Sequence, residues 1–162
     1  MLFRSYTLSL HDALPIYAID RRLERAFQAR GLATANRVHW LAATSRANYL
    51  AINRNADIML DALHWSGGNT SLDALASGLP ILTSRGRFMR GRQSAFMMER
   101  LGLPGWVVPA QQLGRMAAER LGDPDQIRQA RTTITAHQDQ LFSSDAARPD
   151  FLAHVERLAR AH

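Results

Sequence analysis

Two compact apolar runs, at residues 57–61 and 79–83, enclose a glycine-containing loop and a short helical stretch. Each run has the length of a buried parallel strand, and Pro80 lies near the start of the second, where a strand tolerates proline. Between them, residues 70–77 have a helical pattern that Gly78 ends. A strand, a helix and a second strand in this order form a βαβ unit with a parallel sheet. The order therefore indicates an α/β fold.

The remaining segments continue this alternation. The apolar spacing predicts a helix from Ile19 that Gly31 ends, and later helices for which Ser45 and Asp123 are the N-caps. Further expected segments are helices at 45–53, 93–101, 110–121 and 151–158, short strands at 37–41 and 106–108, and an irregular connection at 141–150. Together they predict a parallel sheet, covered on both faces, with helices at the C-terminal end.

Composition narrows the classes of partner. The 162 residues suit one domain, cysteine is absent, and all 20 basic residues are arginine, for a net charge of +6. The arginines are scattered over expected helix faces, apart from one cluster at Arg85, Arg87, Arg90 and Arg92. Aromatic residues are not interleaved with them in the way that stacks bases, so we expect no nucleic-acid partner. No apolar run approaches the roughly 18–20 residues of a membrane span. We therefore expect a cytoplasmic protein that contacts no membrane.

Residues 1–16 have a different character from the rest. Residues 2–5 and 6–16 correspond to the translation of one common sequencing adapter in two reading frames. A signal peptide is disfavoured, because His11 and Asp12 interrupt the apolar stretch and no small-residue cleavage site follows. We interpret this segment as an artefact and expect natural sequence from about Tyr17.

The loop between the two central strands carries the candidate chemistry. A glycine-rich loop that leads into a helix N-terminus presents free backbone N–H groups to an anion, and the helix dipole favours negative charge. We expect Gly67 and Gly68 to allow close approach of a ligand and to adopt positive φ. The candidate phosphate-binding residues are Gly67, Gly68, Asn69, Thr70 and Ser71. Asp73, one turn later, is placed to accept hydrogen bonds from ribose hydroxyls.

A plain capped helix explains the same residues. In that interpretation Asn69 or Thr70 is the N-cap, and Asp73 is a first-turn acid that suits the helix dipole. Local chemistry leaves the two interpretations open.

A longer pattern bears on this choice. Residues 57–83 read D-x-x-L-D, then G-x-x-T-x-x-D-A-L, then G-x-P-x-L-T. This pattern resembles the O-linked N-acetylglucosamine transferase family, and the likeness covers most of residues 17–162. Members of that family have tetratricopeptide repeats followed by two Rossmann-like lobes in the GT-B arrangement. The resemblance implies that residues 17–162 are the C-terminal, UDP-sugar-binding lobe of a GT-B glycosyltransferase, incomplete at its N-terminal end.

The resemblance also implies roles for single residues. Asn69 and Thr70 would contact the diphosphate of UDP, and Asp73 the ribose. Thr44, Arg46 and Tyr49 would lie near the uracil. The sequence departs from the animal enzymes at Gly68, where they have histidine, and at Asn69, where they have threonine; it looks closer to a bacterial branch.

The family reaction is an inverting transfer of N-acetylglucosamine from UDP-GlcNAc to a Ser or Thr hydroxyl of a protein or peptide. It uses no metal. The family's diphosphate-binding lysine and its catalytic candidates lie upstream of the matched region, and this chain has no lysine. We therefore expect the fragment to be inactive alone, with the acceptor-binding lobe and the repeats missing upstream.

Three other residues are candidates for the donor-binding site. His64 and Trp65 either line the donor pocket or form an aromatic cover over the loop. Arg92 is placed to help neutralise the diphosphate, whereas Arg85 and Arg87 read as a solvated basic loop. The histidines show no metal-ligand spacing, so we expect no metal site.

Two other functions remain open from the sequence. The chain could be a non-enzymatic α/β interaction module in which the glycine loop only begins a helix. It could also be part of a GT-B enzyme that transfers another sugar to a carbohydrate acceptor.

Overall fold

The computed structural model describes residues 10–143 and 148–160. The chain divides into two compact units, Met1–Thr44 and Ser45–His162. The interpretation of residues 1–16 as an artefact falls largely outside the described residues, although residues 10–16 belong to the first helix. None of the helices in the described part of the chain is both long and apolar enough to cross a bilayer.

The first unit contains one helix, α1 (Leu10–Gln28), among its described residues. Gly31 follows it with φ +68°, and the Leu32 N–H donates to the Phe27 carbonyl at 3.0 Å, so the expected helix end is confirmed. The strand predicted at residues 37–41 is wrong, because these residues form turn and loop. A strand needs a neighbouring strand for its backbone groups, and the described part of this unit offers none. Trp40 instead donates from Nε1 to Asp20 Oδ1 at 2.9 Å.

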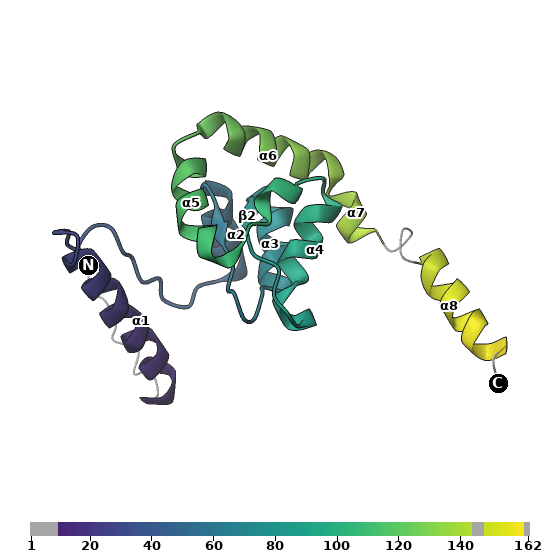
Figure 1. Ribbon diagram of the computed structural model, residues 1–162, viewed down its shortest axis with the longest axis horizontal. Coiled ribbons are helices and arrows are strands. Elements are labelled where there is room, and N and C mark those ends of the chain that lie inside the picture. Colours follow the sequence, from purple (N-terminus) through teal and green to yellow (C-terminus); the bar gives the residue numbers. More distant parts are fainter. Residues whose placement is uncertain (1–9, 144–147, 161–162) are drawn as a thin grey trace. The chain divides into compact units, whose positions relative to one another are not determined.

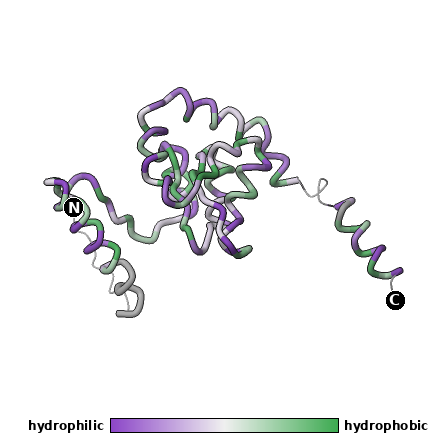
Figure 2. The backbone as a smooth tube through the Cα atoms, viewed as in Figure 1, coloured by the Kyte–Doolittle hydropathy of each residue, from purple (hydrophilic) through white to green (hydrophobic). Residues whose placement is uncertain are grey.

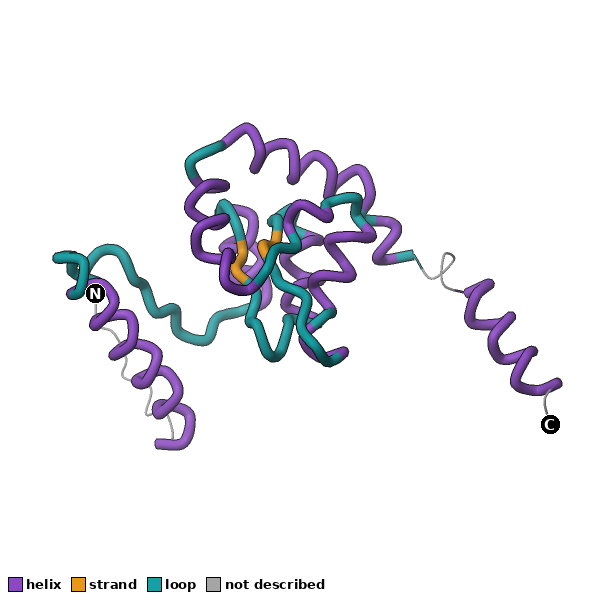
Figure 3. Tube along the Cα trace, in the orientation of Figure 1, coloured by secondary structure: helices purple, strands orange, loops and turns teal. Residues whose placement is uncertain are grey.

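The second unit is rich in helices arranged around a few short strands (Figures 1 and 3). The helices before residue 101 are α2 (Arg46–Asn55), α3 (Asn69–Ala76) and α4 (Gln93–Arg100). Later helices are α5 (Leu113–Leu121), α6 (Pro124–His137), α7 (Asp139–Phe142) and α8 (Arg148–Arg160). Short 3₁₀ turns lie between some of them: η1 (Met89–Gly91), η2 (Pro104–Trp106) and η3 (Ala110–Gln112).

Local signals account for the helix ends. Ser45 Oγ accepts from the Asn48 N–H at 3.3 Å at the start of α2, and Asp123 Oδ1 accepts from the Gln126 N–H at 3.2 Å at the start of α6. Gly78 has φ +74° just beyond α3. These caps and this stop occur where the sequence predicts them. The expected irregular connection at 141–150 is shorter than predicted, because α7 reaches Phe142 and α8 begins at Arg148; its middle lies outside the described residues.

The sheet is parallel, as expected, but small. Strand β1 (Met59–Leu60) pairs with β2 (Ile81–Leu82), and Met59 is opposite Ile81. The predicted third strand is reduced to a single parallel bridge between Thr83 and Val107. In β1, Met59 is half-buried and Leu60 is 54% exposed, whereas both residues of β2 are buried. The prediction of a buried strand is therefore correct for β2 and wrong for β1.

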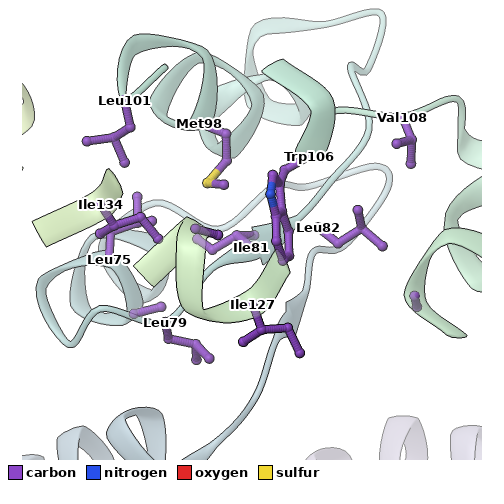
Figure 4. Packing of buried hydrophobic residues seen from close by; sticks show 13 residues of the cluster. Leu75, Leu79, Ile81, Leu82, Met98, Leu101, Trp106, Val108, Ile127 and Ile134 are labelled. Carbon is purple, nitrogen blue, oxygen red and sulfur yellow. The ribbon is translucent and has the colours of Figure 1, made fainter. Parts of the chain in front are cut away.

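The hydrophobic core surrounds β2, and Figure 2 shows hydrophobic segments gathered at the centre of this unit. Figure 4 shows side chains from α3, β2, α4 and α6 meeting there. Leu75, Ile81, Leu82, Met98 and Ile134 are fully buried. This packing fixes the strand ends, and therefore the loops that follow them.

Candidate functional site

The N-terminus of α3 has no side-chain cap. Gly68 occupies the N-cap position with φ −95° and ψ −95°, and no side chain bonds to this helix end. The interpretation in which Asn69 or Thr70 is the N-cap is therefore wrong, and both residues are exposed. The first helical hydrogen bond runs from the Leu72 N–H to the Gly68 carbonyl at 3.0 Å. Earlier amides of the helix have no intrahelical acceptor, which suits them to bind an anion.

The two glycines before α3 have different surroundings, and only Gly67 is closely packed. The expectation of positive φ is wrong for both, because among the described glycines only Gly31, Gly78 and Gly102 have it. A Cβ at Gly67 would overlap the Ser71 hydroxyl, and one at Gly68 would lie 2.9 Å from Gln93 Oε1. Glycine is therefore required at position 67, because the Ser71 hydroxyl is held in place by Ser94. Gln93 Oε1 is the far end of a flexible side chain and can move away from a Cβ at position 68.

A buried carboxylate, which the sequence analysis missed, holds this loop. Asp61 is 8% exposed and lies directly after β1. Its Oδ1 accepts from the Gly67 N–H at 2.9 Å, and its Oδ2 accepts from the hydroxyls of Ser66 and Thr83, both at 2.7 Å. The sequence showed only an acid at a strand end, and nothing in its spacing indicated burial.

The network continues through buried serines. Ser94, at the start of α4, donates its N–H to Ser66 Oγ at 2.9 Å. The Ser94 hydroxyl lies 2.8 Å from the hydroxyl of Ser66 and 2.8 Å from that of Ser71. Ser71 is thus engaged inside the fold. The Ser71 side chain is therefore not available to a phosphate, and only the Ser71 backbone N–H can bind one.

The structure brings Arg46 and Asp73 together. Arg46 Nη2 lies 2.7 Å from Asp73 Oδ1, and Nη1 lies 3.4 Å from Oδ2. The Asp73 side chain is 19% exposed and that of Arg46 is 73% exposed. The first residue of α2 therefore contacts the second turn of α3, close to the uncapped amides. Because α3 begins at Asn69 and its first turn holds no acid, the description of Asp73 as a first-turn acid is wrong.

The other two residues expected near the uracil are Thr44 and Tyr49. Tyr49 is half-buried on α2. Thr44 belongs to the other unit, so the structure does not place it in this site.

The remaining candidates lie along the neighbouring loops. His64 and Trp65 are exposed, and the Arg90 guanidinium lies 5.9 Å from the centre of the Trp65 ring.

The arginines of the next loop are partly engaged. Arg92 donates from Nε to the Gly86 carbonyl at 2.6 Å and so braces its own loop. Arg85 pairs with Glu99, so its description as a solvated basic residue is incomplete. Within the described residues, no group of three or more His, Asp or Glu side chains could hold a metal ion.

The chain was compared with protein families, curated proteins and solved structures. No protein-family model and no curated protein matches the chain. Among solved structures, the chain is similar to an O-GlcNAc transferase of Thermobaculum terrenum, determined as a lysine-to-methionine mutant. The TM-score is 0.70 at 30% identity, and the match covers 89% of this chain and 27% of the other. The chain shares its fold with part of a glycosyltransferase.

This match supports the sequence resemblance at the level of fold. The helix-rich unit with its small parallel sheet is similar to a fragment of an O-GlcNAc transferase. This similarity supports a general relationship between the chain and transferases, at low sequence identity. The chain spans 27% of the length of the matched structure.

Proposed function

We propose that the unit Ser45–His162 binds the nucleoside diphosphate of a sugar-nucleotide donor, UDP-GlcNAc, as the donor-binding part of an inverting glycosyltransferase. The observation that carries this proposal is the uncapped N-terminus of α3 beside the Arg46–Asp73 pair. The resemblance to O-GlcNAc transferases supplies the donor and the acceptor, a Ser or Thr hydroxyl of a protein or peptide.

The diphosphate would bind at the start of α3. The amides of Asn69, Thr70 and Ser71 point out of the helix end, and the exposed Thr70 hydroxyl adds a donor. Gly67 and Gly68 carry no side chains that would keep a phosphate away. Positively polarised amides stabilise an anion without a metal ion.

The ion pair resolves a conflict of charge. An unpaired carboxylate one turn into the helix would repel the diphosphate. Arg46 neutralises Asp73 and orients its oxygens, which leaves Asp73 able to accept hydrogen bonds from the ribose hydroxyls.

In the proposed reaction, the acceptor hydroxyl oxygen bonds to the anomeric carbon while the bond from that carbon to the diphosphate oxygen breaks. The configuration inverts, and the diphosphate leaves with the bonding electrons. The α3 amides would stabilise the charge that develops on this leaving group. We assign no residue of this chain as the base that takes the hydroxyl proton, and we expect no transfer by the chain alone.

Nucleotide-dependent thermal stability tests the proposal. UDP at a hundred times its Kd should stabilise the chain by about 2.7 kcal/mol, which a melting curve resolves. Thr70→Ala and Asp73→Ala should each weaken the UDP-dependent shift. Asp125→Ala is the matched control, because Asp125 is an acid in the first turn of α6 and lies outside this site.

Each alternative function predicts a different result. A non-enzymatic interaction module would show no shift with UDP, or the same shift in all three variants, and either result would contradict the proposal. A transferase of another sugar would be stabilised more by a different sugar nucleotide than by UDP-GlcNAc, which would overturn the assignment of the donor.

A further inference from the structure

A pocket of about 400 Å³ lies beside the glycine loop. It is lined by the loop that follows β1, including His64, and by the arginine-rich loop that follows β2. Ala110, beyond the bridge at Val107, completes it. The pocket therefore lies at the carboxyl ends of the parallel segments, where open α/β sheets place their ligands. Its volume is within the range of small-ligand sites.

The charge of this pocket has one sign. Arg85, Arg87 and Arg90 line it, and no Asp or Glu does. Arg85 is neutralised by Glu99. Arg87 and Arg90 pair with no carboxylate among the residues that the structure describes. Two unneutralised guanidinium groups thus face a concave surface, which favours an anionic ligand.

Aromatic rings hold these guanidinium groups. The Arg90 guanidinium carbon lies 4.8 Å from the centre of the Phe88 ring and 5.9 Å from that of Trp65. The Arg87 guanidinium carbon lies 5.4 Å from the centre of the Phe88 ring. A guanidinium that contacts a ring face keeps its N–H donors free for a carboxylate, whose two oxygens match its fork.

Backbone contacts fix the pocket to the proposed nucleotide site. The Gly86 N–H donates to the Gly91 carbonyl at 2.8 Å, which closes the arginine-rich loop on itself. The Ser66 N–H donates to the Arg90 carbonyl at 2.8 Å, one residue before the glycine pair. The loop that carries Arg87 and Arg90 is thus hydrogen-bonded to the loop that leads into α3.

We propose that this pocket binds a carboxylate side chain of an acidic peptide, with Arg87 and Arg90 as its ligands. The assignment rests on the proposed function, because a peptide held here would lie beside the loop that binds the donor. It would make the chain select acceptor segments in which Asp or Glu neighbours the modified hydroxyl. A nucleic acid fits less well, because Phe88 and Trp65 already contact guanidinium groups and only two of the arginines that line the pocket lack a carboxylate partner in the described part of the chain.

Peptide binding to the full chain tests this assignment. Fluorescence anisotropy would compare a labelled peptide of Asp, Ser and Gly with a matched peptide in which Asn replaces each Asp. We expect the acidic peptide to bind more tightly. Arg87→Gln and Arg90→Gln should each weaken it by about fivefold, the upper end for an exposed ion pair. The double variant should lose roughly twenty-fivefold if the two effects add. Arg115→Gln, an exposed arginine on α5, is the control and should bind as the parent does.

Equal binding of the two peptides, or an unchanged affinity in the double variant, would overturn the assignment. Tighter binding of a single-stranded oligonucleotide than of the acidic peptide would also overturn it. UDP-dependent melting of the same double variant separates the two proposals. A retained UDP shift without peptide discrimination removes only the pocket assignment. Peptide discrimination without any UDP shift in the parent supports the pocket and removes the proposed function.

Discussion

At the scale of single residues, Gly67 connects the candidate site to the fold. Its N–H donates to the buried Asp61 carboxylate at 2.9 Å, and its Cα faces the hydroxyls of Thr70 and Ser71. Ser71 cannot move away freely, because its hydroxyl lies 2.8 Å from that of Ser94 inside the buried network. The position therefore requires glycine because of close packing rather than backbone conformation.

Gly67→Ala tests this reason. The added methyl group should destabilise the chain by about 1–3 kcal/mol, the usual cost of overpacking. It should also weaken UDP binding by displacing the loop. Urea unfolding measures the first effect. Gly114→Ala is the control: a Cβ there meets nothing within 4 Å, and alanine in a helix should be neutral or stabilise by up to about 1 kcal/mol. If both variants unfold at the same urea concentration, the packing argument is wrong.

At the scale of elements, the site depends on how two helices begin and end. Arg46 is the first residue of α2, so the cap at Ser45 orders the residue that holds Asp73. At the other ends, Arg131 of α6 donates to the carbonyls of Ala56 and Gly78, just beyond α2 and α3. One long side chain thus satisfies carbonyls at the ends of both helices that form the site.

Ser45→Ala should therefore affect both stability and binding. Loss of an N-cap hydroxyl costs about 1 kcal/mol, and fraying of the first turn should free Arg46 and reduce the UDP-dependent melting shift. Ser45→Asp, which keeps an N-cap acceptor, should restore the stability. A Ser45→Ala variant with parental stability would show that the 3.3 Å contact to the Asn48 N–H contributes nothing.

At the scale of the whole molecule, the core belongs to one unit. Every residue of the buried hydrophobic cluster lies between Ala74 and Ile134. In the first unit, the described side chains of α1 are exposed or half-buried, and Trp40 and Leu41 are 49% and 69% exposed. Stability should therefore come from the second unit alone.

A chain that begins at Ser45 tests this division. Because it retains the whole core, it should unfold at the same urea concentration as the full chain. Ile134→Ala in the full chain provides the contrast, since truncating a fully buried isoleucine costs about 2–5 kcal/mol. A shorter chain that unfolds as readily as Ile134→Ala would mean that residues 1–44 contribute to stability.

The elements that sequence analysis predicted correctly depend on local chemistry. The caps at Ser45 and Asp123 and the stop at Gly78 involve backbone groups within a few residues, so their residue types suffice. The strand expected at 37–41 failed because strand formation depends on a neighbour that the local sequence does not specify. The pattern of residues 57–83 predicted the parallel pairing of β1 and β2, but not the exposure of Leu60.

The sequence by itself determined the order of strand, glycine loop and helix, and with it the location of the candidate site at the start of α3. Only the tertiary structure decided how that site is held. Asp61 is buried by contacts with Ser66, Gly67 and Thr83, and Ser94 reaches Ser66 across 28 positions. Arg46 meets Asp73 across 27 positions. Such pairs depend on how helices pack around β2, and no spacing along one element records that packing.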